Sequence, residues 1–336
     1  MSLVDPIKAT EAESQKAVKT HNFQFSGIIM ELHQLRYFLS TLNEGSFSSA
    51  AGKHRLTQQA ISKSIGRLEQ ELGAKLFLRD GHQLRPTAVG EMLAVHARTI
   101  DAESRQFQRH LGELLGTAPG ELLIGAGPTA ARRLVAETVR RLLNDRPGIH
   151  VSVSGGTTRS MTPQLKRGEI DAFVSVLTER KPDPQLQCEV ISRELTVLVG
   201  RAEHPLASRS RVSLADTLKF PWLGGAGMGH WGDLVRSSFV TAGLKPPVPT
   251  VKTDSMPFAY GLLACTDYLS VLPVALAQID LDAGRLATIN TPVNWSRPMA
   301  LFYRDTSMQF PAVNAFVTTL RSVAKRLARR SKGASA

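Results

Sequence analysis

Hydrophobic residues after residue 30 recur at the spacing of an α-helix. The first run, which stops at the turn-forming sequence Asn43-Glu44-Gly45, consists of Leu35, Phe38, Leu39 and Leu42. Ser46 and Thr57 can cap a second and a third helix, because a hydroxyl at the N-cap accepts a hydrogen bond from a free backbone N–H. The third helix would bury Ile61, Ile65 and Leu68. Two short helices joined by a few residues predict a helix-turn-helix.

The opposite face of the third helix is polar and basic. It carries Gln58, Gln59, Ser62, Lys63, Gly66 and Arg67. Residues 45–68 contain no acidic residue, so the surface would not repel DNA phosphates. These side chains can donate to and accept from base edges, as a helix in the major groove requires. Any amphipathic helix has a polar face, however, so the segments that follow must support this interpretation.

A basic hairpin is predicted after the third helix. Leu72-Gly73-Ala74-Lys75-Leu76-Phe77 reads as a helix end that runs into a strand. Arg79-Asp80-Gly81-His82 reads as a turn, and Leu84-Arg85-Pro86 as a second strand. Three helices and a hairpin predict a winged helix-turn-helix over residues 30–86.

In order and spacing, these segments resemble the LysR-type transcriptional regulators. The matching motifs are Leu35-Arg36-Tyr37-Phe38, Gly45-Ser46-Phe47 with Ala50-Ala51, Thr57-Gln58-Gln59-Ala60-Ile61-Ser62, Leu68-Glu69, Leu72 to Phe77 with Arg79, and Leu84-Arg85-Pro86-Thr87 with Gly90. Gln59 stands where this family often has proline, and it adds a hydrogen-bonding group that proline lacks. We therefore expect DNA contacts from Ser46, Thr57, Gln58, Gln59, Ser62, Lys63, Arg67, Arg79, His82 and Arg85.

A longer helix is predicted over residues 87–116. Leu93, Ile100, Phe107 and Leu114 repeat every seven residues, and Ala97, Ser104 and Leu111 follow the first three by four positions. This spacing is a heptad seam and predicts a linker helix through which two chains pair. A helix packed on its own protein is the alternative. The family resemblance implies dimers through this helix that commonly assemble as homotetramers, which bind promoter operators and can contact RNA polymerase.

Strands and helices alternate from Glu121 onward. Strands are predicted at residues 122–125, 150–153, 170–174, 194–199, 220–223, 250–253, 268–271 and 299–303, and helices at 132–143 and 161–165. Repeated βαβ units predict a parallel sheet with a ligand beyond the carboxyl ends of its strands. The resemblance, which extends to about residue 325, implies an effector domain of two α/β lobes similar to periplasmic binding proteins. We place it at residues 117–330, before a basic tail end at 331–336.

The loop after the first of these strands is a candidate ligand site. Gly125-Ala126-Gly127-Pro128-Thr129-Ala130 matches the pattern G-x-G-x-x-A, but Ser154-Gly155-Gly156 stands where a dinucleotide site needs an acidic residue. A helix start of this kind favours a carboxylate or another anion. By resemblance, the pocket would be lined by Thr129, Thr157, Thr158, Ser175, Gly224, Thr253 and Ser255. We predict a small carboxylate or aromatic acid as effector, with a sugar or sugar acid as the alternative.

Composition changes this picture in three respects. Half of the formal net charge of +12 lies in residues 321–336, so global charge is weak evidence for DNA binding. The patterns H-E-x-x-H, G-x-x-x-x-G-K-[ST] and G-x-S-x-G are missing, which predicts a protein that is no enzyme and needs no cofactor or metal. Residues 1–29 read as a disordered extension, or as the result of a misassigned start upstream of Met30; they lack a secretory signal. Cys188 and Cys265 then favour a reducing cytoplasm.

Overall fold

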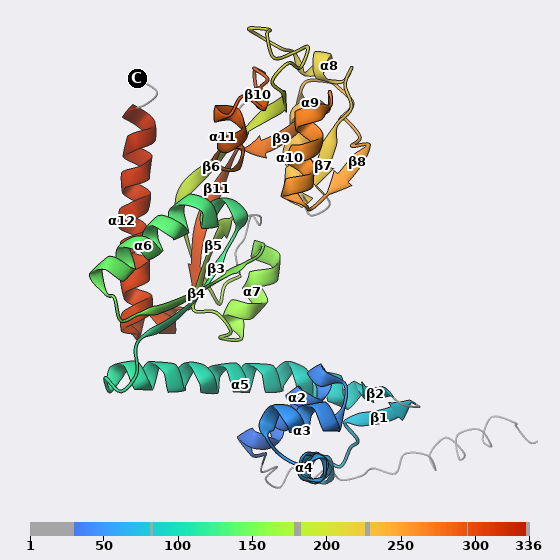
Figure 1. Ribbon diagram of the computed structural model, residues 1–336, viewed down its shortest axis with the longest axis vertical. Helices are drawn as coiled ribbons and strands as arrows, with labels where there is room; N and C mark the ends of the chain where they lie inside the picture. Colours follow the sequence, from blue (N-terminus) through green and yellow to red (C-terminus); the bar gives the residue numbers. More distant parts are fainter. Residues whose placement is uncertain (1–29, 81–82, 178–182, 226–228, 294, 334–336) are drawn as a thin grey trace, which may run out of the picture. The chain divides into compact units, whose positions relative to one another are not determined.

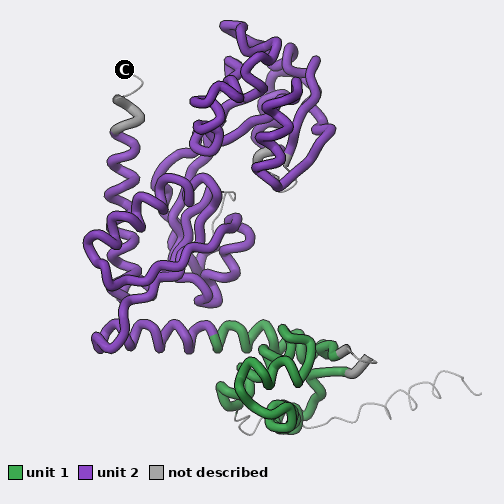
Figure 2. The backbone as a smooth tube through the Cα atoms, in the orientation of Figure 1, with its two compact units in different colours: residues 1–101 green, residues 102–336 purple. Residues whose placement is uncertain are grey.

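The chain divides into two compact units, which meet between Asp101 and Ala102 and are described separately (Figure 2). The computed structural model describes residues 30–80, 83–177, 183–225, 229–293 and 295–333. The predicted extension at 1–29, the candidate DNA contact His82 and the last three residues of the predicted tail lie outside these ranges. The division falls within the predicted linker segment, and the predicted domain boundaries stay a prediction.

The first unit contains three helices and a hairpin, as predicted (Figure 1). Its elements are α2 (Leu32–Glu44), α3 (Phe47–His54), α4 (Gln58–Leu72), β1 (Phe77–Asp80) and β2 (Gln83–Pro86). The strands pair antiparallel and form the wing. The long helix α5 (Ala88–Leu114) begins in this unit, and its residues from 102 onward belong to the second.

One apolar core holds the first unit together. It includes Phe38 of α2, Ile61 and Leu68 of α4, and Leu93 and Ala97 of α5. A Cβ at position 90 would lie 2.3 Å from the carbonyl oxygen of Leu76, so glycine permits the close approach of α5 to the segment before β1. The first turns of the linker helix are therefore part of this core.

The second unit is built on a seven-stranded sheet. Its lower lobe in Figure 1 contains β3 (Glu121–Ala126), the π-helix η1 (Ala130–Val135), α6 (Ala136–Asp145), β4 (His150–Gly155), α7 (Thr158–Lys166), β5 (Ala172–Val176), the 3-10 helix η2 (Asp305–Gln309) and α12 (Pro311–Gly333). Its upper lobe contains α8 (Leu214–Thr217), β7 (Leu223–Gly225), α9 (Gly229–Thr241), β8 (Val251–Thr253), α10 (Met256–Cys265), β9 (Ser270–Pro273), α11 (Val274–Asp282) and β10 (Leu286–Thr288). We call them lobe 1 and lobe 2.

Two long strands, β6 (Gln187–Arg201) and β11 (Trp295–Tyr303), run through both lobes (Figure 1). In β11, Trp295 packs in the core of lobe 2, whereas Met299 and Leu301 pack in the core of lobe 1. The prediction of two α/β lobes is thus confirmed. No helix within the described ranges has the length and hydrophobicity that a bilayer span requires.

The predicted parallel sheet is wrong in part. β3 pairs in parallel with β4 and β5, but β6 and β11 are antiparallel to each other, and β11 is antiparallel to β5. The chain crosses between the lobes along these strands, and hydrophobicity alone does not report strand direction. The strand predicted at 220–223 begins later, at Leu223, and the strand predicted at 170–174 begins after Asp171.

Candidate functional site

Two hydroxyl caps set the positions of α3 and α4. The Ser46 hydroxyl accepts a hydrogen bond from the backbone N–H of Ser49 at 3.1 Å, and that of Thr57 accepts one from Ala60 at 3.2 Å. Arg55 ends α3 in the left-handed region, with φ +55°. The two helices are therefore joined by a tight turn, and the predicted caps are correct.

The predicted polar face of α4 is exposed, whereas its apolar face is buried. The exposed candidates are Gln58, Gln59, Ser62, Lys63 and Arg67. Ile61, Ile65 and Leu68 fix the rotation of the helix by packing in the core. Among the described residues, no carboxylate forms an ion pair with Lys63 or Arg67, so both cations can meet phosphates or base edges. Lys53, in contrast, pairs with Glu44 at 3.0 Å.

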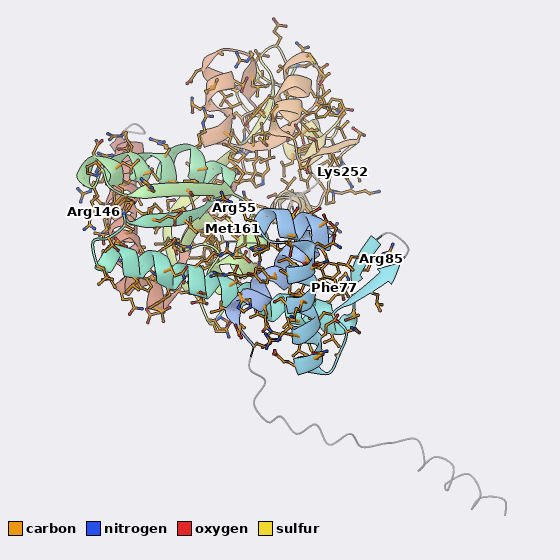
Figure 3. The ribbon with its side chains drawn as sticks, turned by 60° about the horizontal axis from the view of Figure 1, so that its bottom comes forward. Arg55, Phe77, Arg85, Arg146, Met161 and Lys252 are labelled. Carbon is orange, nitrogen blue, oxygen red and sulfur yellow. The ribbon has the colours of Figure 1, made fainter. Side chains whose placement is uncertain are left out.

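The wing is anchored to the helices by aromatic contacts. The ring of Phe77 lies 5.3 Å from that of Phe38 and 5.9 Å from that of Phe47, between ring centres. Arg85 is exposed on β2, opposite Leu78 of β1; Figure 3 labels Phe77 and Arg85 on the two strands. Arg79 lies on β1, but its side chain, like the whole of His82, is outside the described part.

The heptad seam of α5 divides into two parts. Leu93 and Ala97 are buried in the core of the first unit, so at these positions the alternative of a helix packed on its own protein holds. Further along, Phe107 is 66% and Leu114 64% exposed, and Ile100 and Leu111 are exposed as well. The second part of the seam is an apolar face that a single chain leaves uncovered.

In lobe 1 the structure brings four of the predicted effector residues to one end of the sheet. Thr129, Thr157, Thr158 and Ser175 follow or end the parallel strands β3, β4 and β5. The strand ends are joined by hydrogen bonds from the backbone N–H of Gly127 to the carbonyl of Val174 at 2.8 Å and from that of Gly156 to Ala126 at 3.1 Å. The Thr158 hydroxyl donates to the carbonyl of Val176 at 2.6 Å. Hydroxyls gathered in this way at the ends of parallel strands suit a small polar or anionic ligand.

The helix after Thr129 departs from ordinary α geometry. Ala130–Val135 forms a π-helix, and Thr129 itself is helical with φ −69° and ψ −40°, so its hydroxyl does not cap the helix. π-Helical turns occur frequently at functional sites. A Cβ at Gly127 would lie 2.8 Å from the hydroxyl oxygen of Ser175, which shows how closely the loop after β3 approaches β5.

In lobe 2 the remaining three predicted residues form a separate cluster. Gly224 and Thr253 lie on the paired strands β7 and β8, and Ser255 caps α10 by accepting from the N–H of Phe258 at 3.4 Å. The Thr253 hydroxyl accepts from the N–H of Ser255 at 3.0 Å. A Cβ at Gly224 would lie 2.6 Å from Pro249, so this glycine also has a packing role.

The sequence interpretation missed a buried charged cluster where α5 meets lobe 1. Asp171 is fully buried and accepts hydrogen bonds from the Gln106 side chain at 2.8 Å, from the Arg109 guanidinium at 3.4 Å and from the backbone N–H of Leu123 at 2.8 Å. Burial raises the pKa of Asp171 despite these donors. The signal was an aspartate inside an otherwise apolar segment. No group of side chains within the described ranges could hold a metal ion.

Two family models match the chain. "Bacterial regulatory helix-turn-helix protein, lysR family" matches residues 32–91, and "LysR substrate binding domain" matches residues 116–325. Among curated relatives, the SDS degradation transcriptional activation protein of a Pseudomonas species is 31% identical over 77% of this chain and 84% of its own length. The HTH-type transcriptional regulator GbpR of Azospirillum brasilense is 26% identical over 90% of this chain and 89% of its own length.

Solved structures share the fold. CbnR, a LysR family transcriptional regulator, is 23% identical with a TM-score of 0.68, and the match covers 88% of this chain and 99% of CbnR. Full-length CbnR complexed with its target DNA is 22% identical with a TM-score of 0.69, and the match covers 88% of this chain and all of that one. The order of elements, from helix-turn-helix through long helix to α/β domain, is therefore shared.

Proposed function

The chain belongs to the LysR family of transcriptional regulators, effector-responsive DNA-binding proteins rather than enzymes, and on that premise we propose how its own residues do this work. A dimer or tetramer binds a promoter operator through α4 and the wing, in the cytoplasm and within reach of RNA polymerase. A small carboxylate or aromatic acid binds beside Thr129 and Ser175 and controls the complex. The observation that carries the DNA-binding part is the exposed, unpaired basic face of α4.

The DNA-binding proposal is tested by a salt titration. The full chain is mixed with its own upstream region and, separately, with a scrambled duplex of the same composition. We expect the affinities for both duplexes to fall with salt, because counterions are released from the phosphates. We expect specific binding to remain at least a thousandfold tighter at physiological salt. Equal affinities for the two duplexes at every salt concentration would contradict sequence-specific recognition.

Pairing of chains is proposed to use the second part of the α5 seam, since Phe107, Leu111 and Leu114 leave apolar area exposed. Phe107→Glu should convert the dimer or tetramer to a smaller species in light scattering at micromolar concentration. Val248→Glu is the matched control, because Val248 is 74% exposed and lies outside α5. A wild-type chain that is monomeric, or a Phe107→Glu chain with unchanged mass, would exclude this interface.

The effector proposal is tested by thermal denaturation with benzoate, gluconate and galactose. A ligand that binds only the folded protein raises the melting temperature. We expect a rise with benzoate, and we expect Thr129→Val, which removes the hydroxyl with little change of volume, to reduce it. Thr241→Val, at an exposed position on α9, is the control. A rise with galactose or gluconate alone would favour the sugar alternative, which the clustered hydroxyls also suit.

A further inference from the structure

The C-terminal part of α5 is attached to lobe 1 by buried polar contacts. The Gln106 side chain is 4% exposed and donates to Asp171, and Arg109 donates to the same carboxylate. Arg304, which follows β11, contacts both Gln106 and Glu103 of α5. Hydrogen bonds to buried charged groups are stronger than neutral ones and depend more steeply on alignment.

A ring contact extends this attachment toward α12. His110 of α5 is buried and stacks on Phe310, with 3.4 Å between ring centres and an angle of 22° between the planes. Burial, together with the charges of Arg109 and Arg304, lowers the pKa of His110 to about 4. The neutral ring therefore fits beside the two guanidinium groups.

Asp171 joins α5 to two strands at once. One carboxylate oxygen accepts from Gln106 and Arg109, and the other accepts from the backbone N–H of Leu123 in β3. The backbone N–H of Asp171 donates in turn to the carbonyl of Leu123 at 2.8 Å. Asp171 directly precedes β5, so its backbone moves with that strand. A shift between β3 and β5 must therefore change the hydrogen bonds that hold α5.

The other ends of the same strands carry the proposed effector site. β3 leads from Leu123 to Gly127 and Thr129, and β5 leads from Asp171 to Ser175. The four residue-to-residue steps from Leu123 to Gly127 span about 13 Å in an extended strand. The strands are in parallel register, with Ile124 opposite Ala172 and Ala126 opposite Val174. Two adjacent strands thus have ligand-type groups at one end and the anchor of α5 at the other (Figure 1).

We infer that Asp171 is a positioning residue that couples the effector end of β3 and β5 to the linker helix α5. This inference rests on the proposed location of the effector site. A ligand that spreads or slides the two strand ends misaligns the Asp171 hydrogen bonds to Gln106 and Arg109. Because a buried charge without its donors is strongly destabilising, the junction favours discrete arrangements over a gradual deformation. α5 then changes its attachment to lobe 1 in response to a small movement of the strands.

The inference can be tested without knowing the effector, by adding a methyl group where the loop after β3 approaches β5. Gly127→Ala places a methyl group 2.8 Å from the hydroxyl oxygen and 3.4 Å from the Cα of Ser175, so either Ser175 of β5 or the loop after β3 must shift at the effector end. Gly148→Ala is the matched control, because a Cβ at Gly148, in the same lobe, meets nothing within 4 Å. Gln106→Met removes one donor to Asp171 while keeping the length of the side chain. All variants are made in the full chain, alone and in pairs.

The readout is hydrogen exchange of the backbone amides of α5 from residue 103 to residue 114. Gly127→Ala should increase their exchange rates at least fivefold, and Gly148→Ala less than twofold. In a Gln106→Met background, Gly127→Ala should add less than a twofold change, because the shorter of the two hydrogen bonds from α5 to Asp171 is already missing. Equal effects of Gly127→Ala in both backgrounds, or no effect in either, would overturn the inference.

Two provisions keep this result interpretable. If the Gln106→Met chain does not melt cooperatively, Arg109→Met, which removes the other donor to Asp171, takes its place in the cycle. The exchange measurement uses neither DNA nor ligand. If benzoate does not raise the melting temperature, the effector proposal is contradicted, but the exchange result still stands. If Gly127→Ala does not change exchange in α5, the coupling through Asp171 is contradicted, but effector binding is not.

Discussion

The two parts of α5 differ in the chemistry that holds them. In the first unit, Leu93 and Ala97 are buried among apolar side chains, and such contacts are non-directional and tolerate small rearrangements. In the second unit, Gln106 and Arg109 are held by a buried carboxylate, and His110 by a ring stack. Polar contacts of this kind depend on alignment. The comparison suggests that one end of the helix is a permanent attachment and the other a responsive one.

The largest expected effect is at Asp171. Asp171→Ala leaves the buried groups of Gln106 and Arg109 without their acceptor, and breaking a buried charged network costs about 3–5 kcal/mol. Urea denaturation followed by tryptophan fluorescence reports on the second unit, because Trp222, Trp231 and Trp295 all lie there. Exchange rates in α2 to α4 should stay unchanged. A loss below about 1 kcal/mol, the size of one exposed contact, would mean that the network does not hold the helix.

The corresponding change in the apolar part is Leu93→Ala. Truncating a buried leucine removes transfer energy and leaves a cavity, with a typical loss of about 3 kcal/mol. Hydrogen exchange of α2 to α4 should report this loss, while tryptophan fluorescence reports none. If Leu93→Ala and Asp171→Ala each changed both the hydrogen exchange of α2 to α4 and the unfolding followed by tryptophan fluorescence, the two attachments would belong to one cooperative unit. The contrast between an apolar and a polar attachment would then be wrong.

Within the polar attachment, acid should weaken the contribution of His110. The pKa of His110 is about 4 in the folded chain and ordinarily about 6.5, so protonation favours the unfolded state and stability falls as pH drops through this interval. The loss from His110 is about 2 kcal/mol at pH 5 relative to pH 8. Burial raises the pKa values of Asp171 and Glu113, which act in the opposite direction.

The contribution of His110 can be separated by substitution. His110→Phe keeps a ring against Phe310 and removes the titration. The difference between the wild-type and His110→Phe stabilities should therefore change by about 2 kcal/mol between pH 8 and pH 5. A constant difference across this range would show that the buried ring does not titrate as described.

The smallest effect is expected at the start of α5. The Thr87 hydroxyl accepts from the N–H of Gly90 at 3.0 Å and donates to the carbonyl of Lys75 at 2.6 Å. Loss of such a cap costs about 1 kcal/mol. Thr87→Ala should therefore accelerate exchange in the first turn of α5, and Thr87→Ser should restore the wild-type rate. Unchanged rates in Thr87→Ala would mean that apolar packing alone fixes this end.

Local rules predicted the first unit well. Caps at Ser46 and Thr57 and the apolar spacing of Ile61, Ile65 and Leu68 are properties of neighbouring residues, and the structure contains each of them. Turn and strand signals in residues 72–86 predicted the wing, and the heptad spacing predicted the long helix. The heptad pattern, however, could not show that Leu93 and Ala97 pack inside their own chain.

Long-range contacts explain what was missed. Asp171 meets Gln106 across 65 positions, and Arg304 meets it across 198, distances over which spacing carries no information. The antiparallel direction of β6 and β11 was missed for a similar reason, since direction depends on how the chain crosses between lobes. In lobe 1 a ligand position beyond the strand ends could be predicted because parallel strands end on one side, whereas the candidate effector residues came from the family resemblance and stay a prediction.

The measurement that tests the central claim most directly is the specificity ratio of DNA binding, the affinity for the upstream region divided by that for the scrambled duplex. Gln59→Ala at the start of α4 should lower this ratio about tenfold or more, because a good base contact is worth about 1–3 kcal/mol of discrimination. Gln70→Ala, at an exposed position near the other end of the same helix, should leave it within about twofold. Equal ratios for wild type and Gln59→Ala would contradict the claim that this face of α4 reads the operator.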